Sequence, residues 1–202
     1  VAHALIREAG TPIAAPSANP FGYVSPTTAQ HVADGLGNAV DLILDGGPCP
    51  VGVESTIVSL IGPQAELLRP GSITLEQLSA VIGPLSRSSS VVDQPTAPGQ
   101  LARHYATQTP VTILISAKTR PTPTKNERVG LLIFSEASAT DKRFTAVEVL
   151  STTSDLREAA RHLFAALRRL DAQGLDRIYV EPCQEEGLGM AIMDRLRRCA
   201  AS

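Results

Sequence analysis

The sequence of 202 residues contains no tryptophan, and aromatic residues make up only 3% of it. Its three cysteines, Cys49, Cys183 and Cys199, lie far apart and form no C-x-x-C pair. This spacing argues against a zinc site and against a disulfide framework, and it fits a reducing compartment. No apolar run reaches the ~18 residues that a membrane-spanning helix needs, and no signal-peptide pattern opens the chain. We therefore expect a cytoplasmic protein without a membrane partner.

An excess of charge of one sign is also lacking, since 18 Lys and Arg residues stand against 20 Asp and Glu residues. The formal net charge of −2 provides no basic field of the kind that binds a phosphate backbone, so we expect no stable nucleic-acid binding. The sequence contains no G-x-G-x-x-G, and Gly187 with Gly189 is too weak a pattern to predict a dinucleotide site. With 43% hydrophobic residues, the chain can bury a substantial core in one or two domains.

The stretch Pro12–Thr28, PIAAPSANPFGYVSPTT, is apolar up to Pro16 and then becomes a loop of small polar side chains. Ser25 stands where a helix N-cap is expected, and Pro26 suits the first helical position. The start of a helix presents unpaired backbone N–H groups, so a hydroxyl-rich loop that leads into one can hold a phosphate or a carboxylate. An ordinary strand-to-helix turn uses the same residue types, and on spacing alone that simpler interpretation stands ahead.

The first third of the chain alternates short predicted elements. A helix with an apolar face ends at Gly10, and because nothing before Val1 caps it, we expect a fragment or processed product that begins partway into a domain. Thr74 and Gln77 form a capping-box pattern that predicts a helix over Leu75–Ile82. A further helix is expected from Pro26 to Gly35 or Gly37. We expect strands over Pro12–Ala15, Asp41–Leu44, Glu54–Leu60 and Ala65–Arg69, with the third of these central in its sheet.

Residues 83–110 are rich in Ser, Pro, Gly, Gln and Thr, which indicates a linker. Leu101, His104 and Tyr105 within it can dock against other parts of the chain, as is typical of functional loops. The strands expected after the linker are Val111–Ser116, Val129–Phe134, Ala146–Leu150 and Ile178–Glu181. The expected helices are Asp155–Gln173, with Ser154 as N-cap, and Leu188–Ala200. Buried-type strands that alternate with helices predict a parallel α/β sheet.

Six short motifs follow one another along the chain. They are APSAN at 15–19, SPTT at 25–28, DGG at 45–47, GVESTIV at 52–58, LRPG at 68–71, and APG with HYA within 97–106. Together with EGLGMAIMDRLRRCA at 186–200, they resemble the threonylcarbamoyl-AMP synthase family in its long two-domain form. Each motif alone is weak, but six in order make the resemblance specific, and it covers the whole sequence. One departure is Thr107, which stands where a proline usually follows HYA.

The resemblance implies an α/β fold in three parts. Residues 1–84 would form the C-terminal part of a twisted, mixed-sheet, YrdC-like catalytic domain, residues 85–110 a linker that acts as a lid, and residues 111–202 a small Rossmann-like parallel domain. The catalytic domain of the family begins with a segment that carries a lysine and an arginine in a basic triplet, together with a threonine-binding portion. That segment has no counterpart in these 202 residues. We therefore expect this chain alone to have little or no synthetic activity.

The resemblance also implies a nucleotidyltransferase reaction. L-threonine, bicarbonate and ATP would be condensed to L-threonylcarbamoyladenylate and pyrophosphate. A downstream tRNA threonylcarbamoyl transferase machinery would then use the adenylate to form threonylcarbamoyladenosine in tRNA. Mg²⁺ would arrive with the ATP phosphates, and because such an ion needs few protein ligands, no dedicated metal site is expected.

The motifs assign roles to individual side chains in the same way. Ser17 and Ser55 would contact threonine or its carbamate. The ATP ligands would be Asn19, Thr27, Arg69 and Tyr105, and the lid would contain His104 and Tyr105. No residue is assigned a catalytic role separate from binding. Among the other polar residues, Glu54 is interpreted as structural, His31 as incidental, and the arginines of the long helix, Arg157, Arg161, Arg168 and Arg169, as a solvated face.

Two other functions compete with this one. A carbamoyl transferase of the hydrogenase-maturation type carries a related domain, but the HYA linker, the α/β domain that follows it and the absence of zinc-finger cysteines speak against it. A non-catalytic RNA-binding or regulatory module is the other alternative, and the modest acidity of the chain disfavours it.

Overall fold

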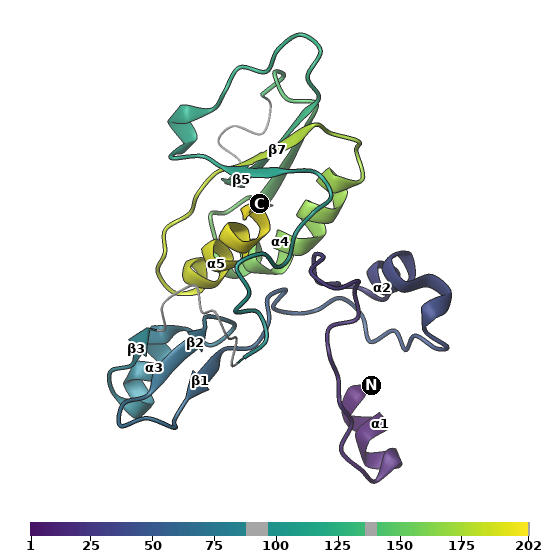
Figure 1. The fold of residues 1–202 in the computed structure, drawn as a ribbon, viewed down its shortest axis with the longest axis vertical. Coiled ribbons are helices and arrows are strands. Elements are labelled where there is room, and N and C mark those ends of the chain that lie inside the picture. Colours follow the sequence, from purple (N-terminus) through teal and green to yellow (C-terminus); the bar gives the residue numbers. More distant parts are fainter. Residues whose placement is uncertain (88–96, 136–140, 202) are drawn as a thin grey trace.

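The computed structural model of the chain describes residues 1–87, 97–135 and 141–201 (Figure 1). Its strands form a three-stranded sheet in the order β1-β2-β3 and a four-stranded sheet in the order β4-β7-β5-β6. The first sheet is mixed and the second is parallel throughout, so the predicted α/β class is confirmed. The Ser-rich centre of the predicted linker, residues 88–96, lies outside the described residues.

The three-stranded sheet belongs to the first part of the chain. Strand β1 (Ile57–Ser59) pairs antiparallel with β2 (Glu66–Arg69), and β2 pairs in parallel with β3 (Ser86–Arg87). The predicted central position of β1 is therefore wrong, because it is an edge strand of this sheet. The strands predicted over Pro12–Ala15 and Asp41–Leu44 are also wrong, since both segments are irregular and largely exposed. A short apolar run becomes a strand only where another strand pairs with it, and no described strand lies beside either run.

The starts of two helices in the first part are set by side chains that satisfy free N–H groups. Helix α2 (Ala29–Leu36) begins later than predicted, because its N-cap is Thr28, whose Oγ1 accepts a hydrogen bond from the His31 N–H at 3.2 Å. The predicted cap, Ser25, donates its hydroxyl to Glu54 instead. A short 3₁₀ helix, η1 (Gly37–Ala39), follows α2. Helix α3 (Leu75–Ile82) has the predicted bounds and the predicted capping box between Thr74 and Gln77.

The first helix, α1 (Ala2–Ala9), ends at Gly10, whose φ of 61° is the left-handed conformation that glycine tolerates. All of its residues are exposed, including the apolar side chains of Leu5 and Ile6. Figure 1 shows α1 standing apart from both sheets. Its predicted apolar face therefore packs on none of the described sheets.

The second part of the chain follows the predicted alternation closely. Its elements are β4 (Val111–Ile113), η2 (Ala117–Thr119), β5 (Val129–Ser135), β6 (Ala146–Ser151), α4 (Leu156–Asp171), β7 (Arg177–Val180) and α5 (Leu188–Ala200). The N-cap of α4 is Asp155, whose carboxylate accepts from the Arg157 N–H, rather than Ser154. Ser154 instead takes a left-handed backbone conformation with φ of 61°.

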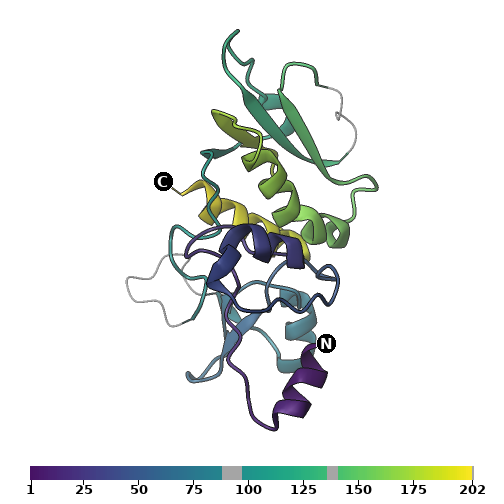
Figure 2. The same ribbon diagram turned by 90° about the vertical axis from the view of Figure 1, so that its right-hand side faces the viewer.

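The four-stranded sheet is buried on both faces. On one face, a separate hydrophobic cluster is formed by Leu114, Val129, Leu131, Ile133 and Phe144. The other face packs against α4 and α5, and that larger core also contains Val24, Val53 and Tyr105 from outside the second part. The two helices lie between the four-stranded sheet and the first part of the chain (Figure 2). The core of the second part therefore anchors segments of the first.

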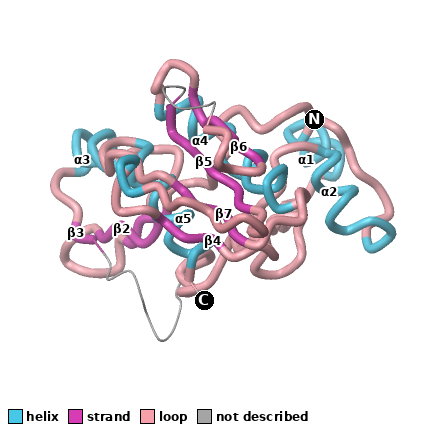
Figure 3. Tube along the Cα trace, turned by 90° about the horizontal axis from the view of Figure 1, so that it is seen from above, coloured by secondary structure: helices cyan, strands magenta, loops and turns pink. Residues whose placement is uncertain are grey.

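Seen from above, β2, β3 and α3 lie on one side of the four-stranded sheet, and α1 and α2 on the other (Figure 3). The segments between these two groups, around Val24 and Val53, pack under α4 and α5. These segments carry the SPTT and GVESTIV motifs. The fold thus places the predicted motifs at the junction of the two parts.

Candidate functional site

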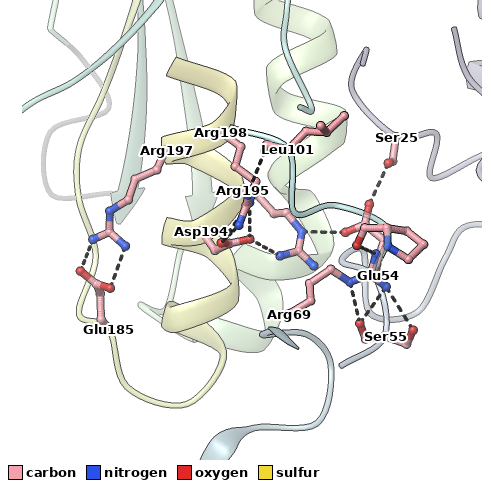
Figure 4. A network of polar contacts seen from close by, with 11 residues as sticks. Ser25, Glu54, Ser55, Arg69, Leu101, Glu185, Asp194, Arg195, Arg197 and Arg198 are labelled. Atoms are coloured by element: carbon pink, nitrogen blue, oxygen red, sulfur yellow. Dashed lines mark hydrogen bonds and ion pairs between the residues drawn. The ribbon is translucent and has the colours of Figure 1, made fainter. Parts of the chain in front are cut away.

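Arg69, at the end of β2, joins three of the predicted motifs. Its side chain is buried, and its Nε and Nη2 both donate to the carbonyl oxygen of Ser55, at 3.1 and 2.9 Å. Nη2 also lies 3.3 Å from the Ser55 hydroxyl, and Nη1 donates to the carbonyl of Pro98 at 3.1 Å. Ser55 remains exposed beside this charge. The GVESTIV turn, the LRPG turn and the APG part of the linker therefore meet at one guanidinium (Figure 4).

Two glycines make this meeting possible. A Cβ at Gly71 would overlap the carbonyl oxygen of Glu54 and would lie 2.5 Å from the nitrogen of Thr56. Gly99 has a φ of 84°, and a Cβ there would lie 2.7 Å from the hydroxyl oxygen of Tyr105. Because real Cβ atoms do not approach other atoms so closely, only glycine fits in these turns. The glycines of LRPG and APG are thus explained by close packing.

Tyr105 and His104 of the linker lie against the second part of the chain. The Tyr105 side chain is only 1% exposed, and its ring stacks on that of Phe164 in α4 with 5.6 Å between centroids. The His104 ring lies edge-on to the Tyr105 ring with 4.1 Å between centroids, and the backbone N–H of His104 donates to the carbonyl of Arg198 in α5. Burial raises the pKa of Tyr105 and lowers that of His104. The predicted lid is therefore docked on α4 and α5.

The opening loop holds the other predicted residues. Asn19 closes a turn, since its Nδ2 donates to the carbonyls of Pro20 at 2.9 Å and Tyr23 at 3.0 Å. Its Oδ1 is buried, and within the described residues it has no hydrogen-bond partner. Ser17, which precedes Asn19 by two residues, is exposed to solvent. Asn19 thus presents an unpaired acceptor two residues after an exposed serine.

Thr27 is buried, and its hydroxyl lies 3.2 Å from Nδ1 of His31. The carbonyl of Thr27 accepts from the N–H of Cys49, which brings the DGG turn beside the start of α2. Burial lowers the pKa of His31, and the nearby charge of Arg168 lowers it further. His31, predicted to be incidental, is therefore the partner of a predicted site residue.

The structure brings Ser55, Arg69 and Tyr105 together, and it holds Asn19 and Thr27 in a separate loop. Glu54, interpreted from the sequence as structural, does hold separate segments together. Its Oε1 accepts from the hydroxyl of Ser25 at 2.8 Å, and its Oε2 accepts from Nε of Arg195 at 2.8 Å. Burial alone raises the pKa of Glu54, but the charge of Arg195 and the hydrogen bonds from Arg195 and Ser25 outweigh it, so the pKa lies below its usual value.

Arg195 itself was not predicted, although a signal was present. It stands three residues after Ile192 and four before Cys199, at the spacing of the buried face of α5. Arg168 was predicted to be solvated, and this is wrong, because its Nη2 donates to the carbonyl of Val24 at 2.5 Å. An arginine at a helical position next to a buried face reaches across to another segment where carbonyls are free to accept.

A cavity of about 1080 Å³ opens between the opening loop, α2, the linker and α4. Tyr23, Arg103, Arg168 and Asp171 are among the side chains that line it. Within the part of the chain that the structure describes, no predicted site residue lines this cavity. The cavity therefore lies beside the candidate site rather than within it.

Over residues 1–87, 97–135 and 141–201, no group of three or more His, Cys, Asp or Glu side chains is arranged to hold a metal ion. In the same ranges, the helices are too short or too polar to cross a membrane.

The chain was compared with known protein families and with individual relatives. A family model described as "Threonylcarbamoyl-AMP synthase, C-terminal domain" matches residues 73–201, and one described as "Telomere recombination" matches residues 1–71. The threonylcarbamoyl-AMP synthase of Bacillus subtilis is 41% identical over 99% of this chain and 60% of its own length. The protein of the same name from Pyrococcus abyssi is 38% identical over 99% of this chain and 61% of its own length.

Solved structures give the same result. The crystal structure of P. abyssi Sua5 complexed with L-threonine has a TM-score of 0.86 and 36% identity, covering 97% of this chain and 60% of that one. A structure of P. abyssi Sua5 in which an adjacent histidine and tyrosine are replaced by alanine also has a TM-score of 0.86, at 35% identity. The chain thus spans about 60% of the length of the relatives it matches. The resemblance drawn from the motifs is confirmed, and the chain belongs to the threonylcarbamoyl-AMP synthase family.

Proposed function

We propose that this protein acts in the synthesis of L-threonylcarbamoyladenylate and pyrophosphate from L-threonine, bicarbonate and ATP. The observation that carries the proposal is the meeting of Ser55, Arg69 and the linker at one guanidinium, because these residues come from three separate family motifs. The relatives named threonylcarbamoyl-AMP synthase, and the solved relative that holds L-threonine, support it.

The chemistry requires several anions to be held together. The amine of threonine attacks the carbon of bicarbonate, and loss of water leaves a carbamate. A carbamate oxygen then attacks the α-phosphorus of ATP, and the bond from that phosphorus to pyrophosphate breaks. Fixed positive charge and hydrogen-bond donors stabilise such a reaction most effectively in a preorganised, partly dehydrated site. Arg69, held by two backbone carbonyls, provides such a fixed charge beside the exposed hydroxyl of Ser55.

We assign Ser17 and Ser55 to threonine or its carbamate, and Asn19, Thr27, Arg69 and Tyr105 to ATP. The unpaired Oδ1 of Asn19 supports its assignment, because a buried acceptor without a donor is costly and a ligand N–H removes that cost. Mg²⁺ would enter with the ATP phosphates. The finer domain description, with a YrdC-like part at 1–84 and a Rossmann-like part at 111–202, belongs to this proposal, as do the cytoplasmic location and the downstream tRNA transferase.

The linker, 85–110 in this scheme, would act as a lid over the adenylate, which hydrolyses when water reaches it. His104–Tyr105 is the only His-Tyr pair in this sequence, and a relative has been studied with such a pair replaced by alanine. The Tyr105 ring stacks on Phe164, so bringing that ring onto ATP requires it to leave this contact. A lid that moves in this way would couple the second part of the chain to the reaction.

The proposal is tested with the protein expressed from its whole reading frame. Pyrophosphate release is measured with ATP, threonine and bicarbonate, and with threonine or bicarbonate left out in turn. We expect release that needs all three, and a product with the mass of threonylcarbamoyladenylate. Release that is independent of threonine or bicarbonate would contradict the proposal.

A further inference from the structure

Arg195, in α5, is a fully buried arginine that reaches out of the second part of the chain. Its side chain is 0% exposed, and its Nε donates to Oε2 of Glu54 at 2.8 Å. Its Nη1 donates to its neighbour Asp194 at 2.6 Å, and its guanidinium lies over the ring of Tyr105 at 5.1 Å. Arg195 therefore contacts the linker at Tyr105 and the GVESTIV turn at Glu54, and Figure 4 shows the contact with Glu54.

Burying an arginine in this way has a large cost in desolvation free energy. Removing a guanidinium from water costs several kcal/mol unless carboxylates and further hydrogen bonds compensate it. The Arg195 side chain is paired with two carboxylates, those of Glu54 and Asp194, and lies over the ring of Tyr105. Replacing both members of such a buried pair by apolar side chains of similar volume is often neutral or stabilising, whereas removing one member alone is strongly destabilising. We therefore expect the Arg195–Glu54 pair to have a role beyond filling space.

Glu54 is fixed at both its side chain and its backbone. One carboxylate oxygen binds Arg195, and the other accepts from the hydroxyl of Ser25. The carbonyl of Glu54 accepts from the N–H of Ser72 at 3.1 Å. The next residue is Ser55, whose own carbonyl is held by Arg69. A displacement of Glu54 would therefore be transmitted directly to Ser55 and to Ser25.

A second contact ties the same turn to α4. Gly52 has a φ of 85°, and a Cβ there would overlap the carbonyl of Ala160 and would lie 2.5 Å from Cα of Arg161. The turn from Gly52 to Ser55 is thus pressed against the backbone of α4 at one end and paired with α5 at the other.

We propose that Arg195 is a positioning residue of the site, which fixes Glu54 and through it Ser55, whose hydroxyl is assigned to the threonine side. This inference rests on the proposed function. It gives the second part of the chain a role in setting the geometry of the threonine site, through the contact of Arg195 with Glu54.

The test compares Arg195→Met with Arg197→Met in the protein expressed from its whole reading frame. Arg197 is a matched control, because it lies on the same helix but forms an exposed pair with Glu185. Arg195→Lys keeps the charge, and Glu54→Asp keeps the carboxylate while shortening its reach. Amide hydrogen exchange of residues 52–58 and the steady-state constants for threonine and ATP are measured for each variant.

We expect faster exchange at 52–58 and a KM for threonine raised about 10- to 100-fold in Arg195→Met and Glu54→Asp, since small misplacements cost this much. The KM for ATP should change little, and Arg195→Lys should recover part of the loss. A variant that is only less folded loses kcat and keeps its KM for threonine, so the KM separates positioning from folding. Arg197→Met should match the parent.

Two results would overturn the inference. Exchange at 52–58 that is the same in Arg195→Met and Arg197→Met would show that Arg195 does not hold the turn, whatever the activity. Faster exchange with an unchanged KM for threonine would show that the turn does not position the site. A parent protein that makes no pyrophosphate would count against the proposed function instead, and the exchange data would still decide whether Arg195 fixes the turn.

Discussion

The hydroxyl of Tyr23, in the opening loop, donates to Oδ2 of Asp171, at the end of α4, across 2.7 Å. The guanidinium of Arg168 lies over the same tyrosine ring at 4.9 Å and donates to the carbonyl of Val24. The loop that carries Asn19 is therefore held against the second part of the chain by a contact that has a titratable group at its centre.

Alkaline pH should weaken this contact. Burial and the hydrogen bond to Asp171 raise the pKa of Tyr23 to about 12. Because the folded state holds the proton more tightly than the unfolded chain, the contribution of Tyr23 to stability is complete below pH 10 and is lost as the pH rises towards 12. We expect the free energy of unfolding, measured in urea from pH 9 to 11.5, to fall less steeply in Tyr23→Phe than in the parent. A slope in Tyr23→Phe equal to that of the parent would contradict this interpretation.

Gly52→Ala should loosen the first part of the chain from α4. The φ of 85° alone costs about 1–2 kcal/mol for a residue with a Cβ. The overlap of that Cβ with the backbone of Ala160 should add about 1–3 kcal/mol, because helix backbone cannot move aside as a side chain can. Gly83→Ala is a matched control, since Gly83 has a φ of 80° with open space around its Cβ position. Equal losses in urea unfolding for the two variants would refute the packing argument.

Arg69→Met should reduce both stability and synthesis. Loss of the guanidinium leaves the carbonyls of Ser55 and Pro98 without these donors, which we expect to cost about 1–3 kcal/mol of unfolding free energy. If Arg69 also holds the nucleotide, threonine-dependent pyrophosphate release should fall sharply in the folded fraction of the variant. Arg87→Met, an exposed arginine on the neighbouring strand, provides the comparison. Turnover per folded molecule equal to that control would remove Arg69 from the ATP site.

The sequence predicted those elements whose signals are local. The capping box of Thr74 and Gln77 set α3 correctly, and the apolar runs after the linker became the parallel strands β4 to β7. Such patterns succeed because the spacing of capping and apolar residues along one short segment carries the signal. The edge position of β1 and the irregular backbone at Pro12–Ala15 were missed, because the presence of a pairing strand is a long-range fact that no local pattern contains.

The candidate site shows the same division. Ser55 and Arg69 were found through motifs, and the structure places them in contact. Glu54 and Arg195 are 141 residues apart, and a charged residue on an apolar helix face does not name its partner. Likewise, the N-cap assigned to Ser25 was wrong because its hydroxyl is committed to Glu54, 29 residues away. Interactions between the two parts of the chain were thus beyond reach of the sequence.

Asn19 is the sharpest test of the opening loop. Its Nδ2 closes the turn through Pro20 and Tyr23, and its buried Oδ1 faces no donor within the described residues. If ATP provides that donor, Asn19→Ala loses one hydrogen bond, and the KM for ATP should rise about 10-fold, as a loss of ~1.4 kcal/mol implies. Asn19→Asp keeps the acceptor but cannot close the turn. Asn38→Ala, an exposed asparagine in η1, is the control. A KM for ATP in Asn19→Ala equal to that of Asn38→Ala would show that this oxygen binds no part of the nucleotide.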